Sequence, residues 1–249
     1  MRTIGFSTGA LARGDFQAAL AMIHAHGIRA VELSALREGE LAPLIQALDS
    51  LGLQRFEFVA FHAPSALVER DERTLATLLR QVAERNLPIV LHPDVIRDFA
   101  CWRDFDNLLC LENMDRRKST GRTCDELESL FAALPNASWC FDIGHASQVD
   151  PTMSEATRML YAFRGRLKHL HASTVNTVGK HEPLTLGTGL SFQRVLHLIP
   201  AQSPIILESC IRPEEINVEL ARARAIFGNS HDSAVRHPET VERRDAALM

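Results

Sequence analysis

Cysteine, tyrosine and tryptophan are scarce in this chain of 249 residues. The five cysteines lie far apart, and their odd number favours packing thiols in a reducing compartment over a disulfide framework. No apolar run approaches the roughly 20 residues of a membrane-spanning helix, and the amino-terminal segment reads as a strand and not as a signal peptide. We therefore expect a cytoplasmic protein that has no membrane partner.

An excess of positive charge is also missing. The formal net charge is −4, which gives no general reason to expect a nucleic-acid partner. The chain is 46% hydrophobic and 23% charged, as in an ordinary globular domain. Its length suits one domain. We expect this domain over residues 1–228 and a flexible tail over 229–249, where apolar periodicity is lost.

Eight short apolar runs recur along the chain, and helix-length amphipathic segments separate most of them. The runs are 3–7, 29–33, 56–62, 88–92, 107–112, 138–142, 166–171 and 204–208. The candidate helices lie near 15–26, 40–51, 71–86, 123–134, 151–165, 191–198 and 213–227. This alternation is typical of a parallel sheet with helical crossovers.

The first run lacks the glycine-rich phosphate turn that an open, doubly wound sheet would carry, because it continues as Ser7-Thr8-Gly9-Ala10-Leu11. We therefore predict a single (β/α)8 TIM barrel of the α/β class. Residues 93–106 leave room only for a short or irregular fourth helix.

Nearly every predicted strand ends in a polar side chain, at the end of a barrel where active sites assemble. Glu112, Asp142 and Glu208 would converge there, and burial and mutual repulsion would cost these carboxylates several kcal/mol. No lysine or arginine stands at these strand ends, whereas neutral imidazoles bind metals. Divalent metal ions therefore account for the pattern better than a hydrogen-bonded polar network. The strand ends are Ser7, Glu32, His62, His92, Glu112, Asp142, His169 with His171, and Glu208.

Seven motifs together resemble those of the xylose-isomerase-like barrel superfamily, which includes endonuclease IV-type enzymes and sugar isomerases and epimerases. The resemblance covers about residues 1–227. Its motifs are FHAPS at 61–65, VLHPD at 90–94, LENMD at 111–115, CFDIGH at 140–145, KHLHAS at 168–173, LGTG at 186–189 and IILES at 205–209.

The resemblance implies a shared metal site made of Glu112, Asp142, His169 and Glu208. It further implies that His62 and His92 hold a second ion, with Glu112 bridging, and that His145 and His181 match the ligands of a third. The aspartate that usually stands two residues before His181 is here Gly179, so a third ion is doubtful unless Glu182 substitutes. We expect two ions, Zn2+ or Mn2+.

Two enzyme functions fit these ligands. In a multinuclear hydrolase, clustered metal ions would cleave a small phosphoester or phosphodiester. In a metal-dependent sugar or sugar-phosphate isomerase or epimerase, Glu112 and Glu208 would be the catalytic groups that shuttle a proton. The presence of His62 and His92 favours the hydrolase. A barrel that binds a metal or metabolite without turnover is a third alternative, supported only by Gly179.

The substrate is expected to be a small molecule. Arg116 and Arg117 lie in a basic loop, residues 115–122, that could hold a phosphate but is equally typical of a solvated loop. Further candidate substrate contacts are Ser7, Glu32, Asn113 and His171, although Asn113 could instead orient Glu112. Duplex DNA is disfavoured because the few large aromatics, Tyr161, Trp102 and Trp139, are not placed as wedges. A homodimer stays possible, since barrels often pair through helices.

Overall fold

The computed structural model describes residues 2–68 and 71–228, and within them eight parallel strands close into a barrel in the order β1-β10-β7-β6-β5-β4-β3-β2. Pairing of β1 with both β10 and β2 completes the closure. The strands are β1 Ile4–Ser7, β2 Ala30–Ser34, β3 Phe58–His62, β4 Ile89–Leu91, β5 Leu109–Glu112, β6 Ser138–Asp142, β7 Leu167–Ala172 and β10 Ile205–Leu207. All eight predicted strands are thus confirmed. The predicted tail, 229–249, lies outside the described residues.

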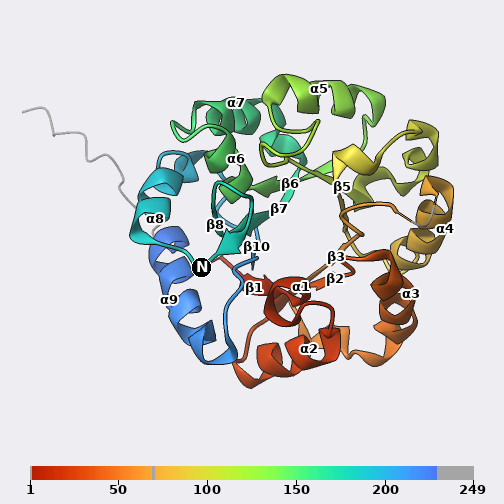
Figure 1. Ribbon diagram of the computed structural model, residues 1–249, viewed down its shortest axis with the longest axis horizontal. Coiled ribbons are helices and arrows are strands. Elements are labelled where there is room, and N and C mark those ends of the chain that lie inside the picture. The colour runs from red at the N-terminus through yellow and green to blue at the C-terminus, as the bar shows by residue number, and fades with distance from the viewer. Residues whose placement is uncertain (1, 69–70, 229–249) are drawn as a thin grey trace, which may run out of the picture.

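Helices surround the barrel on all sides (Figure 1). Several of them begin at side-chain caps. Asp71 caps α4 by accepting a hydrogen bond from the Thr74 amide at 2.8 Å, and Thr123 caps α5 in the same way. The helices are α1 Thr8–Ala12, α2 Phe16–Ala25, α3 Glu38–Ala47, α4 Glu72–Ala83, α5 Cys124–Ala133, α6 Ile143–Val149, α7 Ser154–Phe163, α8 Leu186–Gln193 and α9 Ile216–Phe227.

The fourth crossover is irregular, as predicted. Between β4 and β5 the chain forms only short 3-10 turns, at Pro93–Val95, Phe99–Cys101 and Arg103–Leu108. The α4 residue Glu72 holds this segment, because its carboxylate accepts hydrogen bonds from the amides of Arg97 and Asp98 and from the Trp102 indole. One side chain on a neighbouring helix thus orders a crossover that has no α-helix of its own.

Three features differ from the expectation. The helix expected at 191–198 begins earlier, at Leu186, and Leu196–Leu198 is a separate 3-10 turn. Short helices α1 and α6 follow β1 and β6 directly, where no helix was expected. A small antiparallel hairpin, β8 Thr174–Val175 and β9 His181–Glu182, rises after β7. A strand of two residues is too short to show period-two patterning, so the sequence gives no signal for this hairpin.

The main apolar core lies between the strands and the helices, and a separate small cluster of Val90, Cys110 and Cys140 is buried apart from it. Strand side chains alternate between faces, so these residues share a face with His92, Glu112 and Asp142, two positions further along each strand. These three residues thus form an apolar patch of the barrel interior below the polar ends of their strands. Among the described residues, no helix has the length and apolar character to cross a bilayer.

Candidate metal centre

The carboxyl ends of the strands surround a cavity of about 520 Å3. Strands β3, β5 and β6 end at His62, Glu112 and Asp142, and Glu208 directly follows β10. Many residues of the predicted site line this cavity. They include Ser7, His62, His92, Glu112, Arg117, His145, His181 and Glu208. Parallel strands closed into a barrel bring these residues together from positions almost two hundred residues apart.

A first donor group contains His62, His92 and Glu112. The Nε2 atoms of the two imidazoles lie 3.3 and 3.2 Å from Glu112 Oε2. His62 Nδ1 donates a hydrogen bond to the Ala63 carbonyl at 2.7 Å, so in the neutral ring the lone pair lies on Nε2, the atom that faces Glu112. This orientation would suit a metal ligand.

A central donor group contains Glu112, Asp142, His171 and Glu208. His171 Nδ1 lies 3.4 Å from Glu112 Oε1 and 3.6 Å from Glu208 Oε2. Both His171 Nδ1 and Asp142 Oδ2 are buried, and neither has a hydrogen-bond partner among the residues that the structure describes. Buried polar atoms without partners are rare, and a cation at this position would satisfy both. The residues of this group therefore fit a divalent metal ion.

A third donor group contains Asp142, His145 and His181. Beside it, Gly179 adopts φ +72°, and a Cβ atom there would overlap the guanidinium group of Arg117. The space that a side chain at position 179 would need is thus filled by Arg117. The carboxylate of Glu182 instead accepts a hydrogen bond from the Asn176 amide at 2.8 Å. This group accordingly lacks the fourth protein ligand.

Carboxylates link the three groups, because Glu112 belongs to the first and the central group and Asp142 to the central and the third. Carboxylates shared in this way can bridge neighbouring metal ions. Neighbouring donor groups in this arrangement thus share carboxylates, as groups that hold adjacent ions would.

Burial and charge strongly perturb the pKa values of these residues. Burial alone would lower the pKa of His145, but Asp142 and Glu112 raise it to about 10. Burial likewise opposes protonation of His62, yet its contact with Glu112 and the charge of Glu32 raise its pKa to about 9. Burial raises the pKa of Glu208 to about 7 despite the nearby His171. Without a cation, protons on the imidazoles balance the carboxylates, so metal ions and protons compete for this site.

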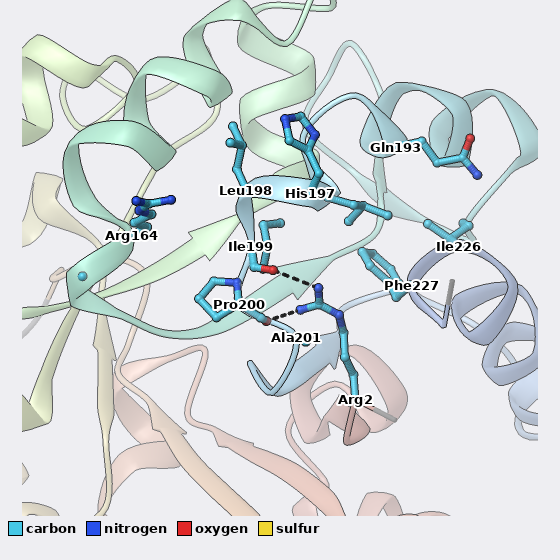
Figure 2. A pocket seen from close by; sticks show the side chains of 12 residues that line it. Arg2, Arg164, Gln193, His197, Leu198, Ile199, Pro200, Ala201, Ile226 and Phe227 are labelled. Atoms are coloured by element: carbon cyan, nitrogen blue, oxygen red, sulfur yellow. Dashed lines mark hydrogen bonds between the residues drawn. The ribbon is translucent and has the colours of Figure 1, made fainter. Parts of the chain in front are cut away.

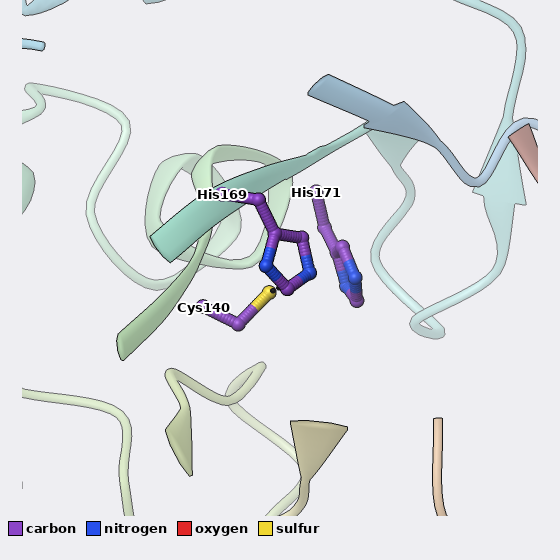
Figure 3. Close-up of side chains that lie close together, drawn as sticks. All are labelled: Cys140, His169 and His171. Carbon is purple, nitrogen blue, oxygen red and sulfur yellow. Dashed lines mark hydrogen bonds between the residues drawn. The ribbon is translucent and has the colours of Figure 1, made fainter. Parts of the chain in front are cut away.

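One expected ligand lies in the wrong layer. The resemblance assigned His169 to the shared metal site, but the structure places His171 beside Glu112, Asp142 and Glu208. The two side chains share a face of β7, and His169, two residues earlier, lies deeper in the barrel beside Cys140 (Figure 3). His169 Nε2 is 3.4 Å from Cys140 Sγ and 3.3 Å from Glu32 Oε2. The structure thus brings His171, and not His169, to the other three residues that the resemblance assigned to the shared site.

Glu32, Asn113 and Arg116 were expected to touch the substrate, but they are not among the residues that line the cavity. Glu32 is fully buried beneath it, and its Oε2 accepts a hydrogen bond from His171 at 2.8 Å. Asn113 is also fully buried and links two strand ends: its amide donates to the Asp142 carbonyl, and its Oδ1 accepts from the Asp142 amide. Arg116 turns to the carbonyl of Gln148 on α6.

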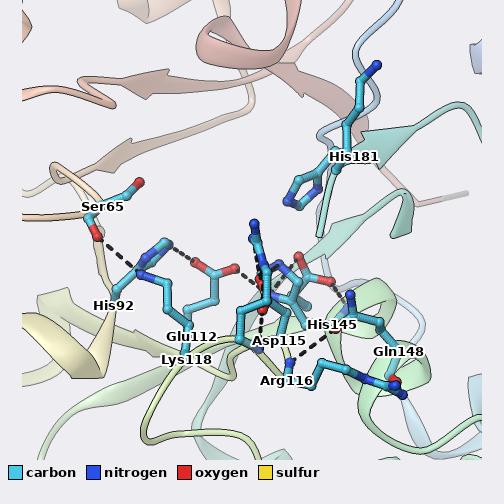
Figure 4. Close-up of polar contacts among 12 residues, drawn as sticks. Ser65, His92, Glu112, Asp115, Arg116, Lys118, His145, Gln148 and His181 are labelled. Carbon is cyan, nitrogen blue, oxygen red and sulfur yellow. Dashed lines mark hydrogen bonds and ion pairs between the residues drawn. The ribbon is translucent and has the colours of Figure 1, made fainter. Parts of the chain in front are cut away.

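The basic loop is ordered by ion pairs (Figure 4). Arg117 forms a bidentate pair with Asp115 and donates to the Val178 carbonyl at 2.9 Å. Lys118 pairs with Asp94 at 2.8 Å. Arg117 and Lys118 both line the cavity, so they can face an anionic substrate, although each already has an acidic partner. The positive charge of the expected phosphate-binding loop is thus partly neutralised by Asp115 and Asp94.

Sequence reasoning missed Asp115 and Cys140. Asp115 lines the cavity, is only 2% exposed and holds Arg117 in place. It stands within the LENMD motif, three residues after Glu112, so the motif carried a signal for it. Cys140 stands two residues before Asp142 on the same strand, and only the packing of β6 against β7 brings it to His169.

A larger cavity of about 920 Å3 lies at the opposite end of the strands, near the residues that precede β1 and β10 (Figure 2). Arg2 spans it with hydrogen bonds to the carbonyls of Ile199 and Pro200. It is lined mainly by apolar side chains and contains none of the donor groups found among the described residues. In barrels this end serves stability, so the smaller cavity is the functional candidate.

Residues 104–226 match the family model described as a xylose isomerase-like TIM barrel, which confirms the resemblance over that segment. Endonuclease IV from Thermus thermophilus is similar in structure, with a TM-score of 0.60, 19% identity, and coverage of 91% of this chain and 99% of that chain. A xylose isomerase domain protein from Alicyclobacillus acidocaldarius has a TM-score of 0.61, 14% identity and coverage of 90% and 98%.

A protein from Anabaena variabilis, described as a putative sugar phosphate isomerase/epimerase, has a TM-score of 0.53, 15% identity and coverage of 88% of both chains. No curated protein matches the sequence. At these identities the structural likeness establishes the fold, and the reaction has to be argued from the site.

Proposed function

For a chain that carries a xylose isomerase-like TIM barrel segment, we propose the function of a divalent-metal-dependent hydrolase that acts on a small phosphoester or phosphodiester. The observation that carries the proposal is the shared Glu112, which joins the His62–His92 pair to the central donor group. A single-ion isomerase has no evident need for two imidazoles on this side of Glu112.

Two ions, Zn2+ or Mn2+, suit the charge of the site. Four carboxylates of the site lack a lysine or arginine partner among the described residues: the buried Glu32, Glu112 and Asp142, and Glu208, whose side chain is 13% exposed. Their four negative charges equal the charge of two divalent ions. The Asp115–Arg117 pair is neutral by itself, and Arg117 fills the space beside Gly179, which argues against a third ion.

Bound in the first and central donor groups, such ions supply a water activated at neutral pH and stabilise negative charge on phosphoryl oxygens. The residues of this chain orient the site. The Ala63 carbonyl fixes His62 by accepting a hydrogen bond from its Nδ1, and Asn113 fixes Asp142 through the backbone. Arg117 and Lys118, at the rim of the cavity, would attract an anionic substrate.

A small substrate is favoured over duplex DNA, although one structural neighbour is an endonuclease IV. Trp102 and Trp139 are fully buried, and the exposed Tyr161 lies on α7, outside the barrel. None of them can serve as a wedge at the mouth. The volume of about 520 Å3 is in the range of small-molecule pockets.

The first test is elemental analysis of the purified protein. We expect about two equivalents of Zn2+ or Mn2+ per chain, a number that follows from the ligand count, and a lower Tm in the presence of a chelator. A protein that contains no transition metal and is insensitive to the chelator would refute the proposal.

The second test separates the reactions. We expect the wild type to cleave members of a phosphodiester panel, His62→Ala to lose about 100-fold or more of that activity, and the exposed His197→Ala to retain it. The contrary result is conversion on a ketose and aldose panel that is unaffected by His62→Ala.

That contrary result would indicate the alternative function, a metal-dependent sugar or sugar-phosphate isomerase or epimerase. One observation favours it: Glu112 and Glu208 both approach His171 Nδ1, at 3.4 and 3.6 Å. Two carboxylates around one ligand position could pass a proton between faces of a substrate, and burial already raises the pKa of Glu208 to about 7. Metal binding without turnover on either panel would instead indicate a binding barrel.

A further inference from the structure

Glu32 is a carboxylate in the interior of the barrel, one layer below the central donor group. It lies on β2, is 0% exposed, and faces β7 across the barrel. Its Oε2 accepts a hydrogen bond from His171 Nε2 at 2.8 Å and a longer one from His169 Nε2 at 3.3 Å. The proposed reaction gives this residue no part, and it is not among the residues that line the cavity.

We propose that Glu32 is a positioning residue that orients His171 for the metal ion of the central donor group. An imidazole that donates from Nε2 presents a lone pair at Nδ1. In His171 that atom is the one beside Glu112 Oε1 and Glu208 Oε2. The carboxylate thus selects the tautomer, sets the ring orientation and makes Nδ1 a better electron donor.

The position of Glu32 also explains the choice between the two histidines of β7. The shorter hydrogen bond goes to His171, whose other nitrogen faces the cavity end of the barrel. His169 has its Nε2 atom beside Cys140 and Glu32, and its buried Nδ1 has no partner among the described residues. Glu32 therefore holds the Nε2 atom of His171, and the Nδ1 atom of the same ring faces the cavity end of the barrel.

A second interpretation is that this layer itself holds an ion, since Cys140, His169 and His171 form one donor group (Figure 3) and Glu32, His62, His171 and Glu208 form another. The geometry disfavours it. Two ligand atoms on one tetrahedral zinc ion lie roughly 3.3 Å apart. The 2.8 Å between His171 Nε2 and Glu32 Oε2 is shorter than this and matches a charge-assisted hydrogen bond. We therefore assign His171 Nε2 to the carboxylate.

The experiment titrates Zn2+ into the metal-free full-length protein in competition with a chromophoric chelator. It compares wild type with Glu32→Gln, which removes the charge, and Glu32→Asp, which withdraws the carboxylate by one methylene. Cys140→Ser is the matched control in the same buried layer. The Tm of each metal-free form and the visible spectrum of each Co2+ form separate a change at the ligand from a loss of folding.

In the Glu32→Gln variant, we expect one of two bound ions to weaken by about 10- to 100-fold, with an altered Co2+ spectrum and a folded metal-free protein. Glu32→Asp should weaken the same ion, and Cys140→Ser should bind as wild type does. Wild-type affinity in both Glu32 variants would overturn the role of Glu32, as would loss of one ion in Cys140→Ser. This inference rests on the proposed metal site, and absence of Zn2+ binding by the wild type would instead refute the proposed function.

Discussion

Single residues decide which strand positions become ligands. On β7, His169 and His171 point the same way, yet only His171 reaches Glu112 and Glu208. Two residues along a strand shift a side chain by about 7 Å, which is more than the reach of an imidazole. A motif that contains two histidines therefore specifies the strand face, and the position along the strand decides which histidine meets Glu112 and Glu208.

The side chain of Asn113 pairs with the backbone of Asp142 as a neighbouring strand would. The amide donates to the Asp142 carbonyl at 2.7 Å, and the Asp142 amide donates to Asn113 Oδ1 at 2.9 Å. These bonds hold the end of β6 against the end of β5. Asn113 thus positions Asp142, a residue of the central donor group, through the backbone.

We predict that Asn113→Ala lowers the free energy of unfolding by about 2–4 kcal/mol, because it leaves two buried backbone groups of Asp142 unpaired. Urea unfolding followed by circular dichroism measures this change. The exposed Asn136→Ala, in the loop that precedes β6, is the control and should cost less than about 0.5 kcal/mol. Equal stabilities of the two variants would contradict the role given to Asn113.

At the scale of elements, the fourth crossover shows how a barrel tolerates a missing helix. Three 3-10 turns replace it, and Trp102 is fully buried among them. The carboxylate of Glu72 takes the hydrogen bonds that a helix would otherwise form internally, from two backbone amides and the indole. The segment depends on α4 for its order.

Replacing Glu72 with alanine should therefore loosen the crossover. We expect a loss of about 2–4 kcal/mol in unfolding free energy and a shift of tryptophan emission to longer wavelength, because the Trp102 indole loses its acceptor. Trp139, fully buried in β6, supplies a constant background. Glu84→Ala at the other end of α4 is exposed and should leave the emission unchanged. Unchanged emission in the Glu72 variant would show that the crossover is held by apolar packing alone.

At the scale of the whole molecule, the concentration of buried charge links stability to pH. In the metal-free protein, the carboxylates raise the pKa of His62 to about 9 and of His145 to about 10, above the unfolded value of 6.5, although burial opposes both shifts. A raised imidazole pKa stabilises the folded state fully below 6.5, and this contribution is lost as the pH rises through the folded value. Burial raises the pKa of Glu208 to about 7, so the ionisation of this carboxyl also lowers the stability of the folded state as the pH rises toward 7.

We therefore predict that the Tm of chelator-treated protein falls by about 5 °C or more between pH 6.5 and 9.5. Thermal unfolding in a series of buffers of equal ionic strength measures it. Protein saturated with Zn2+ is the control, and its Tm should fall less because cations replace the protons. A metal-free Tm that stays constant or rises over this range would contradict the charge assignment.

The strands, the closed barrel and the strand-end residues that surround the cavity could be predicted from the amino-acid pattern, because apolar runs and their polar ends follow from local chemistry and from the rule that parallel strands share an edge. Tertiary structure alone decided the rest. The depth of His171 over His169, the turn of Arg116 away from the cavity and the place of Arg117 beside Gly179 depend on contacts between residues distant in the chain. Such contacts depend on register, side-chain reach and shared space, which spacing along a sequence does not encode.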